Sequence, residues 1–142
     1  MNKMTILLVE DNPDDSFFFQ EMLCELAESS HAFSYDCILK ETLKDAEKYL
    51  KRCHQKPDTI LLDLHLPDSW GLDSIERILL ITKDIPIVVL TGLDDQDTAL
   101  QSLKRGAQDY LVKGHFSSEM LLKSLRYSIE RFGILREKQS LI

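Results

Sequence analysis

Three short segments of the chain are apolar almost without interruption: residues 5–9 (TILLV), 59–64 (TILLDL) and 85–90 (IPIVVL). A strand covered on one face alternates apolar and polar residues, whereas a strand buried on both faces does not. Continuous apolarity therefore predicts strands inside a parallel sheet that has helices on both sides. Two weaker candidates, residues 33–39 and 107–112, would complete the sheet.

A helical pattern follows each predicted strand, at residues 14–29, 41–54, 72–82, 95–105 and 117–138. Asn12 followed by Pro13 is a typical helix start, and Gly106 is a typical helix end. One strand and one helix, repeated five times, predict a doubly wound α/β fold. We expect a flavodoxin-like (βα)5 arrangement with five parallel strands in the order 2-1-3-4-5.

The length of 142 residues suits one domain, which we place at residues 1–132. Residues 133–142 (GILREKQSLI) keep helical character, with Leu135 extending an apolar stripe, and stop without a capping signal. This helical extension is either a frayed terminus or the start of a linker to an output domain.

The overall charge and the cysteines restrict the class of protein. A formal charge of -7 disfavours nucleic-acid binding and suits a cationic ligand such as a metal ion. Apolar runs are too short for a membrane span, and the N-terminus lacks a signal-peptide pattern. Cys24, Cys37 and Cys53 form no C-x-x-C pair, which indicates reduced packing residues in a cytoplasmic protein.

Charged and polar residues gather where the predicted strands end. Glu10 and Asp11 follow the first strand, and Asp63, Thr91 and Lys113 stand at the ends of the third, fourth and fifth. Ligand sites in parallel α/β sheets lie beyond the carboxyl ends of the strands. In the expected strand order these side chains would share one edge of the sheet.

The acids at this edge need a counterion. Asp14 and Asp15 fall in the first helical turn, where carboxylates favour the helix dipole, and we assign them no chemistry. Glu10, Asp11 and Asp63 together would raise the pKa of at least one carboxyl group. A divalent cation resolves this conflict, and Mg²⁺ suits it well, with Mn²⁺ as the alternative.

Four motifs in this order and spacing resemble the receiver domain of two-component response regulators. They are LVED before Asn12, LLDLHLPDSWGLD around Asp63, VVLTG at Thr91 and DYLVKG at Lys113. The resemblance covers roughly residues 3–130. It implies that Asp63 accepts a phosphoryl group from a phosphohistidine donor.

The same resemblance assigns the other residues of the site. Glu10, Asp11, Asp63 and the backbone carbonyl of His65 would hold Mg²⁺, while the His65 side chain would lie exposed in a loop. The implied donor is a sensor histidine kinase or a histidine phosphotransfer protein.

The remaining assigned residues concern the response to phosphorylation. Lys113 would pair with a phosphoryl oxygen, and the Thr91 hydroxyl would donate a hydrogen bond to another. Tyr110 matches the family's switch aromatic, so the surface of the fourth helix, fifth strand and fifth helix would control an output domain, a partner or a homodimer. Exposed Trp70 is a candidate partner contact.

One residue departs from the family's pattern. The family usually has proline after the lysine, often with a cis bond, but here Gly114 follows Lys113. Because a cis bond before a non-proline residue costs about 2.5–4 kcal/mol, we expect a trans bond or a more mobile loop.

Two other functions remain as alternatives. A receiver-like interaction module that is no longer phosphorylated is compatible with Gly114. A Mg²⁺-dependent phosphatase with an aspartate nucleophile is disfavoured, because such enzymes want a second Asp where His65 stands. We therefore expect a phosphoacceptor signalling domain that catalyses only its own phosphorylation and dephosphorylation.

Overall fold

A single five-stranded parallel sheet forms the centre of the computed structural model, which describes residues 3–30 and 32–140. Its strands are β1 (Met4–Val9), β2 (Tyr35–Lys40), β3 (Thr59–Asp63), β6 (Ile87–Thr91) and β7 (Asp109–Val112). They lie in the order β2-β1-β3-β6-β7, which is 2-1-3-4-5 along the chain. The predicted strand order is confirmed.

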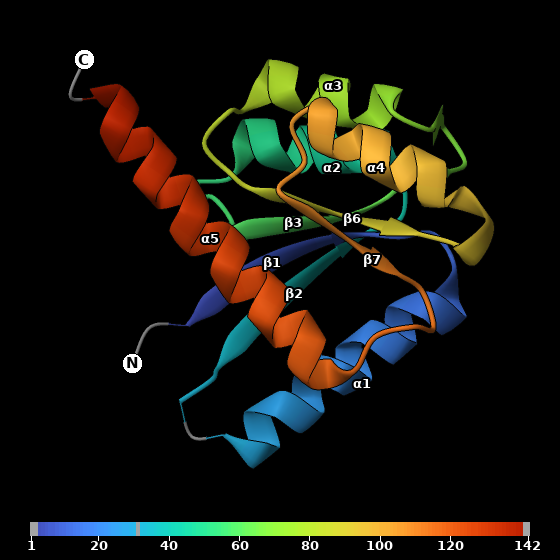
Figure 1. The fold of residues 1–142 in the computed structure, drawn as a ribbon, viewed down its shortest axis with the longest axis vertical. Helices are drawn as coiled ribbons and strands as arrows, with labels where there is room; N and C mark the ends of the chain where they lie inside the picture. Colours follow the sequence, from blue (N-terminus) through green and yellow to red (C-terminus); the bar gives the residue numbers. More distant parts are fainter. Residues whose placement is uncertain (1–2, 31, 141–142) are drawn as a thin grey trace.

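Five α-helices cover the two faces of the sheet (Figure 1). Helices α2, α3 and α4 lie on one face, and α1 and α5 lie on the other. Their bounds are Pro13–Ser29 for α1, Leu43–Arg52 for α2, Asp73–Ile81 for α3, Gln96–Lys104 for α4 and Ser118–Ser140 for α5. The predicted flavodoxin-like (βα)5 fold is therefore confirmed.

The central strands are buried on both faces, which explains why their sequences do not alternate. In β1, Leu7 and Val9 pack in one core while Ile6 and Leu8 pack in the other. Every residue of β3 and β6 is buried. Each of these strands therefore presents apolar residues to both helical layers.

The edge strands match their predictions less closely. Strand β2 is mostly half-buried and begins two residues later than expected, at Tyr35. Among the inner strands, β6 begins at Ile87, two residues later than expected. Just before it, the carbonyl of Pro86 accepts the Ile60 N–H at 3.0 Å. The structure adds a short hairpin of two two-residue strands, β4 (His65–Leu66) and β5 (Ser69–Trp70), where the sequence analysis expected a loop at His65.

Two helix starts use different caps. The Asn12 side chain accepts the N–H groups of Asp14 and Asp15, as predicted from the local sequence. Helix α2 is capped by Thr42, and the Asp68 carboxylate accepts the Leu43 N–H at 2.9 Å and the Lys44 N–H at 2.8 Å. Asp68 thus stabilises α2 from the loop after β3.

The C-terminal helix, α5, extends beyond the edge of the sheet toward the C-terminus (Figure 1). The Leu135 side chain and residues 141–142, which belong to the predicted extension, lie outside what the structure describes. Over residues 3–30 and 32–140, no helix combines the length and apolar character needed to cross a bilayer.

Candidate functional site

The carboxyl ends of four adjacent strands meet at one edge of the sheet. Glu10 follows β1, Asp63 ends β3, Thr91 ends β6 and Lys113 follows β7. Together with Asp11, these residues form what we call the carboxyl-end cluster. The structure thus brings together all five side chains that the sequence analysis placed at this edge.

Three carboxylates of this cluster lie close enough to share one cation. Glu10, Asp11 and Asp63 each offer an oxygen, and these atoms all lie within 4.8 Å of one another. Glu10 and Asp63 are buried, at 1% and 4% exposure, while Asp11 is exposed. Hard oxygen ligands that remain open to water on one side fit a Mg²⁺ ion.

Lys113 is the cation that the chain itself places in the cluster. Its Nζ lies 2.6 Å from Glu10 Oε1, 2.9 Å from Asp63 Oδ2 and 2.9 Å from Asp15 Oδ2. The contact with Asp15 was missed in the sequence, where that residue had only a helix-dipole role. Because 98 positions separate the two residues, no local pattern could reveal this contact.

The two buried acids respond oppositely to their surroundings. Burial, followed by hydrogen bonding with Asp63, raises the pKa of Glu10 to about 8 against the opposing effect of Lys113. Burial also acts to raise the pKa of Asp63, but hydrogen bonds with Glu10, the His65 N–H and Lys113 outweigh it and lower that pKa. Two adjacent carboxyls cannot both ionise freely, so the neighbouring Asp63 disfavours ionisation of Glu10.

The neighbouring acids keep Lys113 protonated. Burial acts to lower its pKa, but hydrogen bonds with Glu10, Asp15 and Asp63 outweigh burial and raise the pKa well above its ordinary value. Lys113 therefore stays protonated throughout the physiological range. A permanent ammonium beside Asp63 can pair with an incoming anion.

His65 contacts the cluster through its backbone and a neighbouring loop through its side chain. Its N–H donates to Asp63 Oδ1 at 2.9 Å. The ring stacks on Trp70 with centroids 4.1 Å apart, and Nε2 lies 3.2 Å from Asp95 Oδ2. The side chain is thus half-buried rather than exposed, whereas Trp70 is 69% exposed as predicted.

Thr91 supplies a polar group without a partner. Its hydroxyl is buried and has no hydrogen-bond partner among the residues that the structure describes. A buried hydroxyl in this state costs free energy unless an incoming ligand satisfies it. Tyr110, half-buried on the neighbouring strand, packs against the core beneath α2 and α3.

The loop after Lys113 adopts one of the two arrangements expected for it. The Lys113–Gly114 peptide bond is trans, and Gly114 has a φ of 79°, in the region that favours glycine. The Lys113 N–H donates to the Thr91 carbonyl at 2.8 Å, which holds the lysine at the end of β7.

Comparison with known proteins agrees with this arrangement. Residues 6–126 match the response regulator receiver domain. The chain is 34% identical over 131 residues to the phosphate regulon transcriptional regulatory protein PhoB of Pseudomonas aeruginosa, covering 91% of this chain and 53% of PhoB. The chain thus spans about half the length of that relative.

Two solved structures have the same fold. The receiver domain of sensor histidine kinase PA1611 from Pseudomonas aeruginosa PAO1, with a magnesium ion coordinated in its active site cleft, has 30% identity and a TM-score of 0.74, covering 91% of this chain and 99% of that one. The signal receiver domain of a putative LuxO repressor protein from Vibrio parahaemolyticus has 26% identity and a TM-score of 0.77, covering 95% and 96%. With a family match over most of its length, the chain belongs to the response regulator receiver domain family.

Proposed function

We propose that this domain accepts a phosphoryl group onto Asp63 from the phosphohistidine of a sensor histidine kinase or histidine phosphotransfer protein. The observation that carries the proposal is the convergence of Glu10, Asp11 and Asp63 within 4.8 Å at the carboxyl end of the sheet. Such a group of acids is unfavourable alone and suits a protein that binds a cation for phosphoryl transfer.

The ion we propose is Mg²⁺, held by Glu10, Asp11, Asp63 and the backbone carbonyl of His65. When bound, it would offset negative charge on the transferring phosphoryl group. The raised pKa of Glu10 agrees with a site in which Lys113 alone does not fully offset the burial of the acids. The magnesium ion in the PA1611 receiver supports this assignment, and nothing in the residues favours Mn²⁺ over Mg²⁺.

The transfer exchanges one bond for another. A carboxylate oxygen of Asp63 forms a bond to phosphorus as the donor's phosphorus–nitrogen bond breaks. The donor imidazole leaves neutral, because its other ring nitrogen carries a proton. Lys113, 2.9 Å from Asp63, pairs with a phosphoryl oxygen, and the Thr91 hydroxyl donates to another.

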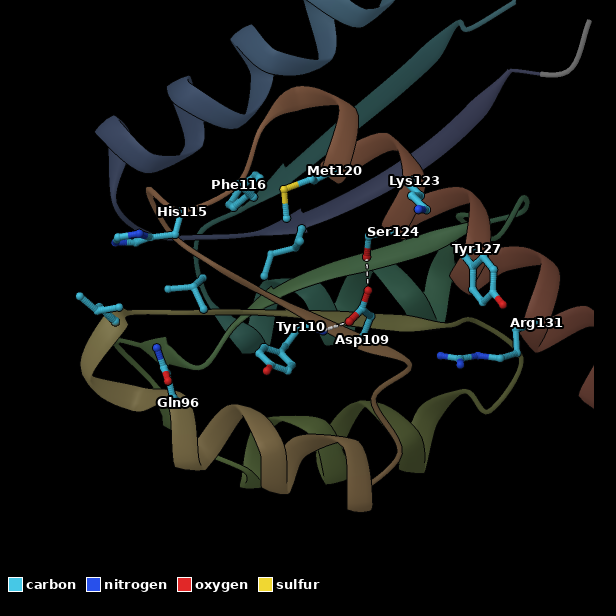
Figure 2. A pocket seen from close by; sticks show the side chains of 13 residues that line it. Gln96, Asp109, Tyr110, His115, Phe116, Met120, Lys123, Ser124, Tyr127 and Arg131 are labelled. Atoms are coloured by element: carbon cyan, nitrogen blue, oxygen red, sulfur yellow. Dashed lines mark hydrogen bonds between the residues drawn. The ribbon is translucent and has the colours of Figure 1, made fainter.

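We further propose that this change is transmitted to the surface formed by α4, β7 and α5. A groove of about 880 Å³ opens there, and Figure 2 shows Tyr110 and Gln96 on one side and Met120 and Tyr127 on the other. Tyr110 follows Thr91 as the hydroxyl turns toward the phosphoryl group. The altered surface would contact an output domain, a separate effector or a second copy of the chain.

The division of the chain into a domain and an extension is part of the same proposal. We propose that residues 1–132 act as the signalling unit and that the helical extension at 133–142 links it to an output domain. The continuation of α5 to Ser140 supports this view. We expect this domain to act in the cytoplasm without binding nucleic acid directly, in line with its charge of -7.

The test is intact mass spectrometry after incubation with acetyl phosphate and Mg²⁺. The wild type should gain one labile phosphoryl group, and Asp63→Asn should gain none, while Asp11→Asn should lose most of the adduct. Absence of an adduct on the wild type would favour the unphosphorylated interaction module. Continuous release of phosphate from simple esters would favour the phosphatase alternative.

A further inference from the structure

A contact between His65 and Asp95 joins the two loops beside the proposed phosphorylation site. His65 belongs to the β4–β5 hairpin, and Asp95 ends a short 3₁₀ turn, η1 (Leu93–Asp95), in the loop between β6 and α4. The imidazole lies between the Trp70 ring, 4.1 Å away by centroids, and the Asp95 carboxylate, 3.2 Å from Nε2. The loop that follows Thr91 is therefore tied to the loop that follows Asp63.

Asp95 is also the residue that immediately precedes α4. An aspartate at this position ordinarily accepts the N–H of the second or third helical residue, here Asp97 or Thr98. The Asp95 side chain makes no such hydrogen bond. In contrast, Asn12 caps α1 and Thr42 caps α2 with their side chains. The Asp95 carboxylate contacts His65 and leaves the start of α4 without a side-chain cap.

We propose that Asp95 is a two-position switch between His65 and the N-terminus of α4. This inference rests on the proposed function of Asp63. In the structure the Thr91 hydroxyl has no partner among the described residues, which is the condition expected before phosphorylation. In the proposed switch, the His65 contact is the position that Asp95 occupies before phosphorylation.

Phosphorylation acts on this contact from both of its sides. A phosphoryl group adds about -1.5 to -2 charge at Asp63, whose Oδ1 accepts the backbone N–H of His65, and so repels the Asp95 carboxylate held by the side chain of the same residue. Thr91 lies four positions before Asp95, so a turn of its hydroxyl toward the phosphoryl group moves the loop. Asp95 is then released and caps α4.

The consequence is a change in the helix that forms one wall of the groove in Figure 2. Gln96, the first residue of α4, lines that groove. Capping by Asp95 fixes the first turn of α4 and thereby the position of this wall. Asp95 is a positioning residue, because it acts through His65 and α4 rather than on the phosphoryl group.

The test follows amide exchange at Asp97 and Thr98 by NMR, with beryllium fluoride and Mg²⁺ as the phosphoryl mimic. In the wild type, one of these amides should exchange about fivefold more slowly with the mimic, as expected from the ~1 kcal/mol of a helix cap. Emission from Trp70, the one tryptophan of the chain, should change in the same titration. Asp95→Ala should lose the slowing and still bind the mimic.

The matched control is Asp94→Ala, which removes an exposed carboxylate from the same turn and should behave as the wild type. Slowing that persists in Asp95→Ala, or that is lost in Asp94→Ala, would overturn the proposal. A second variant, His65→Leu, removes the imidazole that holds Asp95. In this variant the slow exchange at Asp97 or Thr98 should appear in the free protein, without any mimic. If these amides exchange as fast in His65→Leu as in the free wild type, the proposal of a switch is overturned. This outcome does not depend on the mimic, so it tests the switch even if the wild type fails to bind the mimic and the proposed function is wrong.

Discussion

Two acidic residues at the same end of the sheet, Asp68 and Glu10, experience opposite surroundings. Asp68 accepts two backbone N–H groups at the start of α2, and although burial acts to raise its pKa, these hydrogen bonds lower it. Glu10 is buried beside Asp63, and its pKa rises to about 8. Both residues are acids in loops after strands, yet one is stabilised as an anion and the other resists ionisation.

The difference separates an acid at a helix N-terminus from an acid in a crowded cluster. A carboxylate that serves the fold finds donors that satisfy its charge, as Asp68 does at a helix N-terminus. The carboxyl-end cluster instead concentrates negative charge that only Lys113 offsets among the described side chains in contact with it. Closely spaced acids with shifted pKa values are typical of ligand-binding and catalytic sites.

The largest expected effect on stability comes from Lys113→Met. This change leaves Glu10 and Asp63 buried without their cation, and it should reduce the free energy of unfolding by roughly 3 kcal/mol at pH 7. Urea denaturation measures the loss. Lys3→Met, which breaks the exposed pair between Lys3 and Asp36, is the control and should cost less than about 1 kcal/mol. Equal losses in the two variants would contradict the account.

Replacing the ionisable group of Glu10 should raise the free energy of unfolding, whereas Lys113→Met lowers it. In the unfolded chain Glu10 ionises near its ordinary value of 4.5, but in the fold it ionises near 8, so it lowers stability progressively as the pH rises between these values. Glu10→Gln should therefore stabilise the metal-free protein at pH 8 by at least about 1.4 kcal/mol, one pKa unit. Denaturation at pH 5 should show most of this gain gone, and a destabilised variant at pH 8 would refute the prediction.

Asp68→Ala should have the smallest effect of the three. Loss of two N–H···O contacts should cost about 1 kcal/mol at pH 7. Because the folded pKa of Asp68 lies below its ordinary value of 3.8, its contribution is complete above that value and disappears as the pH falls through the folded pKa. Thermal melts at pH 7 and pH 3 should show the variant and wild type converging in acid. A constant difference would point to lost packing instead.

Features set by local sequence could be predicted well. Continuous apolarity identified β1, β3 and β6, and the Asn12 cap followed from its neighbours alone. The edge strand β2 was placed less accurately because its half-buried residues carry a weaker pattern. The strand ends then followed from the order of the sheet, which is why all five cluster residues could be placed at one edge.

Contacts between distant residues could not be predicted in this way. Asp15 meets Lys113 across 98 positions, and Asp68 caps a helix that begins 25 positions earlier. His65 was expected to be exposed, but the β4–β5 hairpin places it against Trp70 and Asp95. Each contact depends on how loops fold back across the end of the sheet, which no short-range pattern records.

We propose that Glu10, Asp11 and Asp63 share one magnesium ion. The most direct test of this claim is urea denaturation with and without Mg²⁺, at ionic strength matched with sodium chloride. The wild type should gain about 1.4 kcal/mol when Mg²⁺ is tenfold above its dissociation constant, because the ion binds only the folded state. The double variant Asp11→Asn/Asp63→Asn should gain nothing, and an equal gain in both proteins would contradict the claim.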